Sequence, residues 1–252
     1  MKKIMFTFAV MTSSAFAQEP LDQYYSPEEM AASRAMLKHI TGAMNQTFVM
    51  ADKFEYRPAN GGALAWEAKG WHGGDKEKLW INSEAEYSFE EDGFEEGNVE
   101  ILYSRAVSPF FDVQAGIKQD FNMGPGRTYG QIGFMGLAPY WFELGGALNI
   151  SNKGEVSANF EVEYELLLTQ RLILQPAAEI SINFEDIEEM GIGSGLSDLE
   201  AGLRLRYEIF REIAPYIGVS WHKKFGQTAE FAEHHGHSSS EASFVAGVRM
   251  WY

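Results

Sequence analysis

The 252-residue sequence contains no cysteine, which excludes disulfide bonds. It also contains no apolar run near the roughly 18 residues of a membrane-spanning helix, although 45% of its residues are hydrophobic. Basic residues are few: 20 Lys and Arg accompany 36 Asp and Glu, which gives a formal net charge of −16. This charge argues against nucleic acid as a partner and favours cations.

What the sequence does contain is a strict alternation of apolar and polar residues between positions 155 and 209. Phe160 and Leu166 share one parity there, whereas Glu161 and Glu163 share the other. A period of two indicates β-strands with one apolar face and one charged face. Neighbouring strands of this kind are typical of a barrel in lipid, apolar outside and polar inside. We therefore predict an all-β fold, a transmembrane antiparallel β-barrel that is monomeric and contacts outer-membrane lipid.

The amino terminus has the features of a secretory signal peptide. Lys2 and Lys3 precede an apolar run at positions 4–11, and Ala15 to Ala17 form an A-x-A cleavage site. Ser26 to Glu29 resemble a capping box that starts a marginal helix. We assign residues 1–17 to the signal peptide, 18–46 to a short N-terminal periplasmic arm and 47–252 to the barrel.

The barrel segment is long enough for about 12 strands, since each spanning strand needs about 9–11 residues. Ten strands remain the alternative, if two of the segments fuse. Pro176 falls inside one segment, although proline has no N–H for a strand ladder. We place the strands near 47–57, 62–72, 78–89, 97–106, 110–120, 128–137, 140–150, 155–167, 170–184, 197–210, 214–224 and 242–252.

The connections alternate between tight turns and longer polar loops. The tight turns lie at 108–109, 138–139, 169–170 and 212–215, and the longer loops at 90–97, 119–127, 185–195 and 227–240. Short periplasmic turns opposite longer extracellular loops are expected of an outer-membrane barrel with an even strand count. Both termini would then lie in the periplasm of a Gram-negative bacterium.

Parity also predicts which polar side chains face the lumen. Two interpretations stay open, and both can hold together: an internal salt-bridge network that stiffens the barrel, or an acidic lumen that lowers the energy of a passing cation. The inward residues are Glu67, Lys69, Glu84, Glu86, Glu100, Asp112, Gln114, Lys118, Glu143, Glu161, Glu163, Glu165, Arg171, Gln175, Glu179, Glu200, Arg204, Arg206 and Glu208.

Long motifs rich in aromatic residues and glycine follow one another along the barrel segment. They are GWHGGD at 70–75, KLW at 78–80, LYSR at 102–105, GLAPYWF at 136–142, LTQRLILQP at 168–176, GSGL at 193–196, GLRLRYE at 202–208, RE at 211–212, APY at 214–216 and FGQTA at 225–229. Together they resemble the copper resistance protein B family of Gram-negative outer-membrane proteins. The resemblance implies copper handling at the outer membrane.

Family members typically carry an amino-terminal region rich in Met and His repeats, which suits both Cu(I) and Cu(II). The arm of this sequence departs from that pattern, because it holds only scattered residues such as Met36, His39 and Met44. We therefore expect copper selectivity to reside in the barrel or at its mouth, and keep these three arm residues as candidate ligands.

In the barrel, the sharpest metal candidate is the cluster of His234, His235 and His237 on a predicted extracellular loop. Three imidazoles within four residues suit Cu(II), although surface histidines are often only solvated. Met135 and His222 share parity with lumen residues and are candidate ligands, although a lone inward Met or His more often serves packing or hydrogen bonding.

These observations lead to one functional hypothesis and two rivals. The first is an outer-membrane copper-resistance protein that binds or passes copper ions. The second is a plugged structural barrel that anchors a periplasmic copper-binding partner, and the third is a generic cation channel. No catalytic site is expected, because no Gly-x-Ser-x-Gly elbow and no oriented nucleophile is present.

Overall fold

The computed structural model describes residues 24–40, 44–59, 61–90, 92–121 and 126–252, and the chain forms two compact units, Met1–Ala43 and Met44–Tyr252. The predicted signal peptide lies outside the described residues. In the first unit, α1 (Pro27–Ile40) begins at the predicted capping box: the Ser26 N–H donates to Glu29 Oε2 at 3.0 Å, and the Glu29 N–H donates to Ser26 Oγ at 3.3 Å. Within the described residues, no helix has the length and apolarity to cross a membrane.

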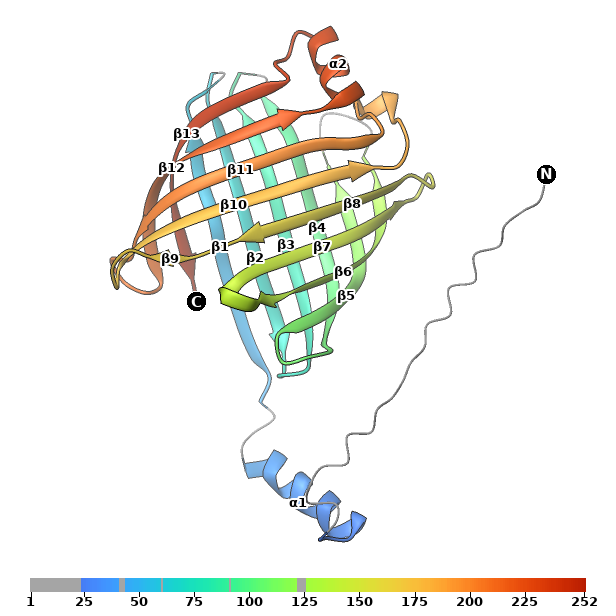
Figure 1. Cartoon of the computed structure of the whole chain (residues 1–252), viewed down its shortest axis with the longest axis vertical. Coiled ribbons are helices and arrows are strands. Elements are labelled where there is room, and N and C mark those ends of the chain that lie inside the picture. Colours follow the sequence, from blue (N-terminus) through green and yellow to red (C-terminus); the bar gives the residue numbers. More distant parts are fainter. Residues whose placement is uncertain (1–23, 41–43, 60, 91, 122–125) are drawn as a thin grey trace, which may run out of the picture. The chain divides into compact units, whose positions relative to one another are not determined.

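The second unit is a closed antiparallel β-barrel (Figure 1). β8 and β9 both pair with the same neighbour, β10, one after the other. The two segments together therefore form one of the twelve strands of the barrel wall. Pairing of β10 with β11 closes the ring. The strands are β1 (Gln46–Arg57), β2 (Ala63–Gly73), β3 (Glu77–Ser88), β4 (Gly93–Ala106), β5 (Phe111–Asp120), β6 (Thr128–Ala138), β7 (Phe142–Ser151), β8 (Val156–Glu163), β9 (Leu166–Leu167), β10 (Leu172–Asn183), β11 (Gly195–Tyr207), β12 (Ile213–Lys224) and β13 (Ser240–Trp251).

The predicted strands are all present, and the tight turns and long loops segregate to opposite ends as expected. At one end, the turn end, the connections are residues 74–76, 107–110, 139–141, 168–171 and 208–212. At the other, the loop end, the longest connections are 184–194, with η3 (Glu188–Met190), and 225–239, with α2 (Gly226–His234; Figure 1). Two of the predicted polar loops contain regular structure: 227–240 contains most of α2, and β4 begins at Gly93, inside the predicted loop 90–97.

The start of β1 and the end of β13 both lie at the turn end. Val49 and Tyr252 exchange backbone hydrogen bonds of 3.0 and 2.8 Å there. At the same end η2 (Pro139–Trp141) holds Tyr140 and Trp141 at φ of 69° and 67°, a left-handed conformation that costs a non-glycine residue on the order of 1–3 kcal/mol. Both rings are exposed, as expected of an aromatic girdle.

Pro176 is accommodated by a gap on one side of its strand. Its carbonyl accepts a hydrogen bond from the Tyr164 N–H at 3.1 Å, so its nitrogen also faces that neighbour rather than β11. Tyr164 lies at the interruption between β8 and β9, where the proline has no N–H to donate. On the other side, the ladder to β11 keeps a regular register through Pro176↔Leu203. The missing N–H of Pro176, which conflicted with its place in a predicted strand, therefore coincides with the break between β8 and β9.

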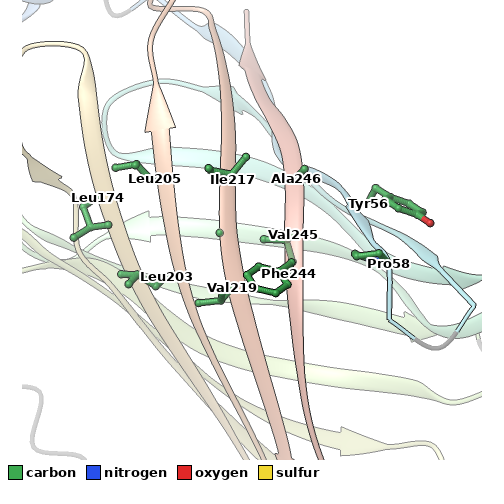
Figure 2. Close-up of a pocket in the computed structure, with 11 residues that line it drawn as sticks. Tyr56, Pro58, Leu174, Leu203, Leu205, Ile217, Val219, Phe244, Val245 and Ala246 are labelled. Atoms are coloured by element: carbon green, nitrogen blue, oxygen red, sulfur yellow. The ribbon is translucent and has the colours of Figure 1, made fainter.

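The outward face is apolar, and over β10 to β13 it forms a shallow hollow of about 550 Å³ (Figure 2). Leu203, Ile217, Val219 and Phe244 lie side by side in it, and all four are substantially exposed. Exposed leucine, isoleucine and phenylalanine on one continuous face are suited to contact with lipid chains rather than water.

Leu203 tests this outward face. Leu203→Arg places a charge among apolar side chains in the middle of β11, where Arg on the lipid face costs about 2–4 kcal/mol. The variant should assemble poorly into membranes, which heat-modifiability on gels will measure. Gln170→Arg adds the same charge in an exposed turn and should assemble like the wild type. Normal assembly of both variants would mean that this face does not contact lipid.

Candidate functional site in the barrel lumen

A β-bulge in β1 brings two adjacent charged residues into the lumen. The pairing of β1 with β2 shifts by one residue between Ala51 and Lys53. As a result Asp52 and Lys53 both face inward: Asp52 contacts Arg249 at 2.9 Å, and Lys53 contacts Glu67 at 2.6 Å. The list of inward residues predicted from alternation therefore contained no charged residue of β1. The available signal was the Asp52-Lys53 pair itself, because consecutive charges in a spanning strand cannot both avoid lipid without a bulge.

Glu55, which follows the bulge, is the centre of the most buried polar cluster in the described barrel. Its carboxylate is fully buried and accepts two hydrogen bonds from Arg204 at 3.0 Å, two from Arg57 at 2.9 and 3.0 Å, and one from the Tyr216 hydroxyl at 3.0 Å. Arg57 continues the network to Glu200 at 3.2 Å. Charge-assisted bonds at this density hold β1, β11 and β12 together on their lumen side.

A second cluster joins β9, β10, β11 and β13 toward the turn end. Glu165, between β8 and β9, accepts from Arg206 at 2.6 Å and from Arg249 at 2.7 Å. Gln175 bridges the system, because it accepts from Arg206 at 2.7 Å and donates to Glu163 at 2.6 Å. Arg206 on β11 is thus linked to two glutamates of the β8–β9 segment, directly to Glu165 and through Gln175 to Glu163. Arg204 instead pairs with Glu55, whose inward position follows from the bulge in β1.

Besides Glu165, two residues predicted to face the lumen lie outside the strands. Arg171 is exposed in the turn before β10, and Glu208 is half-buried just after β11. Alternation persists in the sequence beyond the end of the strand, but the backbone already turns at these positions.

Side chains of β1 to β8 and of β10 line a chamber of about 170 Å³ in the lumen. Its charged lining consists of five carboxylates and three lysines: Glu67, Glu84, Glu100, Glu161, Glu179, Lys53, Lys69 and Lys118. The formal charges of this lining sum to −2.

Met135 faces this chamber, as parity predicted. Its sulfur accepts a hydrogen bond from Gln114 Nε2 at 3.0 Å. Its partner on β7 is Gly145, which in turn lies opposite Glu161 on β8. A Cβ at Gly145 would lie 2.2 Å from the Glu161 carboxylate, so the absence of a side chain is what lets Glu161 lie across β7. A thioether and a carboxylate thus flank the same glycine.

The remaining predicted ligands are dispersed. His222 Nε2 lies 3.1 Å from Asp198 Oδ1 near the loop end. The three imidazoles His234, His235 and His237 are exposed at the end of α2, where His235 Nδ1 contacts the Phe231 carbonyl at 2.7 Å. Within the described part of the chain, no three His, Asp or Glu side chains are grouped to hold a metal ion.

The arm candidates belong to the first unit or to the start of the second. The side chains of Met36 and Met44 are exposed, and the side chain of His39 lies outside the described residues. Their assignment as copper ligands stays a prediction.

At the loop end, a buried arginine ties three connections together. Arg127, only 1% exposed, donates to Glu155 at 2.9 and 3.2 Å and to Glu189 at 3.1 Å. Lys153 also donates to Glu189, at 2.7 Å. The hydrogen bond from Arg127 is the main cause that holds the pKa of Glu155 below its ordinary value of 4.5. Hydrogen bonds from Lys153 and then Arg127 lower the pKa of Glu189 in the same way.

Comparison with known proteins now decides the family. The family model for the copper resistance protein B precursor matches residues 45–252. The chain belongs to the copper resistance protein B family. It is 42% identical to copper resistance protein B of Escherichia coli over 205 residues, which cover 81% of this chain and 69% of that protein. It is also 42% identical to the homolog of Pseudomonas syringae pathovar tomato over 211 residues, 83% of this chain and 71% of the relative.

Among solved structures, the NanC porin has a similar fold. It superposes with a TM-score of 0.53 at 14% identity and covers 81% of this chain and 99% of the porin. At that identity the likeness concerns the fold alone. This member of the copper resistance protein B family is therefore an outer-membrane-type β-barrel with a porin-like architecture.

The Glu55 cluster predicts a large stability effect of Arg204. Arg204→Ala leaves the buried Glu55 carboxylate without two of its charge-assisted bonds, and removing one partner of a buried pair typically costs about 3–5 kcal/mol. The unfolding midpoint in denaturant should fall clearly. Arg171→Ala, the same change in an exposed turn, should leave the midpoint unchanged. Equal midpoints for the two variants would show that Glu55 is solvated rather than packed.

The Arg127 cluster predicts a loss of loop order in acid. Because the pKa of Glu155 is lowered in the fold, its stabilising contribution is complete above the ordinary value of 4.5 and is lost as the pH falls through the folded value. Protection factors from hydrogen exchange (the intrinsic rate at each pH divided by the observed rate) at 152–155 and 184–194 should stay high between about pH 7 and pH 5 and fall below about pH 4. Arg127→Gln should have low protection factors at every pH. Wild-type protection factors that do not change over this pH range would contradict the assignment.

Proposed function

We propose that the barrel binds or passes copper ions across the outer membrane of a Gram-negative bacterium, with both termini in the periplasm. The observation that carries this proposal is the chamber, where a surplus of carboxylates surrounds an inward-facing thioether. Carboxylates lower the energy of a cation in the lumen, and the soft sulfur of Met135 suits Cu(I). Membership of a family named for copper resistance supports copper as the cargo.

Other residues would extend the route on both sides of the chamber. His222, beside Asp198, lies toward the loop end and offers an imidazole for Cu(II). His234, at the end of α2, and His235 and His237 just after it would collect ions at the same end. Met36, His39 and Met44 would act on the periplasmic side. In this scheme the protein changes no covalent bond and acts without catalysis.

A second function is favoured by a different observation. The clusters around Glu55 and Glu165 fill the lumen beside β1 and β9 to β13 with paired side chains. A lumen packed in this way suits a structural barrel that anchors a periplasmic copper-binding partner. Such a barrel would pass neither copper nor other ions.

Flux through liposomes separates these functions, and Met135 gives the sharpest variant. Met135→Leu keeps the side-chain volume but removes the sulfur, so copper flux should fall several-fold while K⁺ flux is unchanged. Met250→Leu is the matched control, because Met250 is exposed on the outward face, and its flux should equal that of the wild type.

The other outcomes of this measurement decide between the rivals. No flux of any ion through the wild type would reject passage and leave the anchoring function. Equal copper and K⁺ flux, insensitive to Met135→Leu, would identify a generic cation channel.

A further inference from the structure

The chamber contains three buried side-chain amide oxygens with no hydrogen-bond partner. They are Asn82 Oδ1, Gln131 Oε1 and Asn149 Oδ1, and all three residues line the chamber. Gln131 is 8% exposed and Asn149 is 3% exposed. The two lie directly opposite each other on β6 and β7. Because an unpaired buried acceptor costs free energy, the chamber must supply a partner for these oxygens.

Hydrogen bonds to neighbouring side chains determine which atom of each asparagine amide, the nitrogen or the oxygen, has no partner. Asn149 Nδ2 donates to Asn159 Oδ1 at 2.9 Å, and Asn159 Nδ2 donates to Ser181 Oγ at 2.8 Å. Asn82 Nδ2 donates to Glu100 Oε2 at 3.1 Å. The NH₂ groups are therefore held by neighbours, and the oxygens are the atoms available to the chamber.

Two positions next to Gln131 carry no side chain. Gln131 lies opposite Gly116 on β5, where a Cβ would lie 2.0 Å from the Ile101 carbonyl oxygen, so this position admits only glycine. Gly133, the next inward position after Gln131, lines the chamber. No side chain at these two positions covers the Gln131 amide, which faces the chamber.

The charge of the lining selects the kind of ligand. Five carboxylates against three lysines disfavour an anion, and oxygen acceptors would repel one further. A cation, in contrast, gains from both the carboxylates and the amide dipoles. Trp80 Nε1 is a buried donor without an acceptor in the same chamber, and it would donate to a water molecule that the cation retains.

We propose that Gln131 and Asn149, which lie opposite each other on β6 and β7, form a niche of two amide oxygens for a partly dehydrated alkali-metal cation such as K⁺. Neutral amide oxygens can replace part of the hydration shell of a monovalent ion, as backbone carbonyls do in cation channels. Mg²⁺ is excluded by its reluctance to dehydrate, and a soft ion prefers the sulfur of Met135 over amide oxygen. The niche rests on the proposed function only in that a cation must be able to enter the chamber.

Anomalous diffraction tests the niche directly. Crystals of the full chain grown without K⁺ and soaked in thallium(I) nitrate, whose ion substitutes for K⁺, should show an anomalous peak between Gln131 and Asn149. The isosteric double variant Gln131→Met/Asn149→Leu should lose this peak. Asn98→Leu, which changes another chamber-lining amide, should keep it. Density for water alone at the wild-type niche would overturn the proposal.

A variant that adds a charge tests the niche even if the double variant does not fold. Asn149→Asp adds a carboxylate at the niche and should raise thallium occupancy above that of the wild type, whereas unchanged occupancy would count against the niche. Copper flux in liposomes of the same proteins separates the two proposals. A thallium peak in a barrel that passes no copper would support the niche and reject the proposed passage of copper. Copper flux without any thallium peak would support copper passage and reject the niche.

Discussion

The closed ladder of backbone hydrogen bonds is the constraint on which the rest of this structure depends. In lipid, no backbone N–H or C=O can remain unpaired, so the sheet must have no free edge, and β10 must meet β11. Closure then forces alternate side chains into a narrow interior. Because the outward positions are reserved for lipid, the charged residues in the middle of the strands are placed in the lumen, where each must find a partner or water. The salt-bridge clusters follow from that geometry.

Two local exceptions show how the ladder adapts without opening. The bulge in β1 inserts one residue and reverses the parity of the strand, which lets Asp52 and Lys53 face the same side. Pro176 removes one donor, and the loss is confined to the interruption between β8 and β9, because its other edge pairs regularly with β11. Both sites border the charged clusters, since Asp52 contacts Arg249 and Pro176 follows Gln175.

Much of the barrel could be predicted from the sequence because alternation is a local signal. Within each strand, alternation of apolar and polar residues indicates the outward and the inward face, as Phe160 and Glu161 do. Proline and polar residues indicate the turns. Parity cannot reveal the bulge in β1, because an inserted residue reverses which positions face inward after it. The partner of Arg204, Glu55, was therefore missed. The helix α2 was missed because its short apolar pattern, with Thr228 and Ala232 buried, depends on packing against neighbouring loops.

The candidate site could be predicted only in part, for a similar reason. Parity placed Met135 inside, but the chamber around it depends on the glycines opposite it, and which amide oxygens lack partners depends on side-chain hydrogen bonds between strands. Local sequence does not encode such cross-strand relations.

The arrangement of the charged clusters in the lumen bears on how one barrel could combine rigidity with passage. The clusters around Glu55 and Glu165 lie beside β1 and β9 to β13, whereas most of the chamber lining comes from β2 to β8. The chamber lining itself includes the ion pairs of Lys53 and Lys69 with Glu67. Salt bridges thus hold the strands on both sides, and amides, glycines and one thioether stand among the charged groups of the chamber. A passing cation would then meet fixed, pre-oriented groups, since the strands that carry them are held by these bonds.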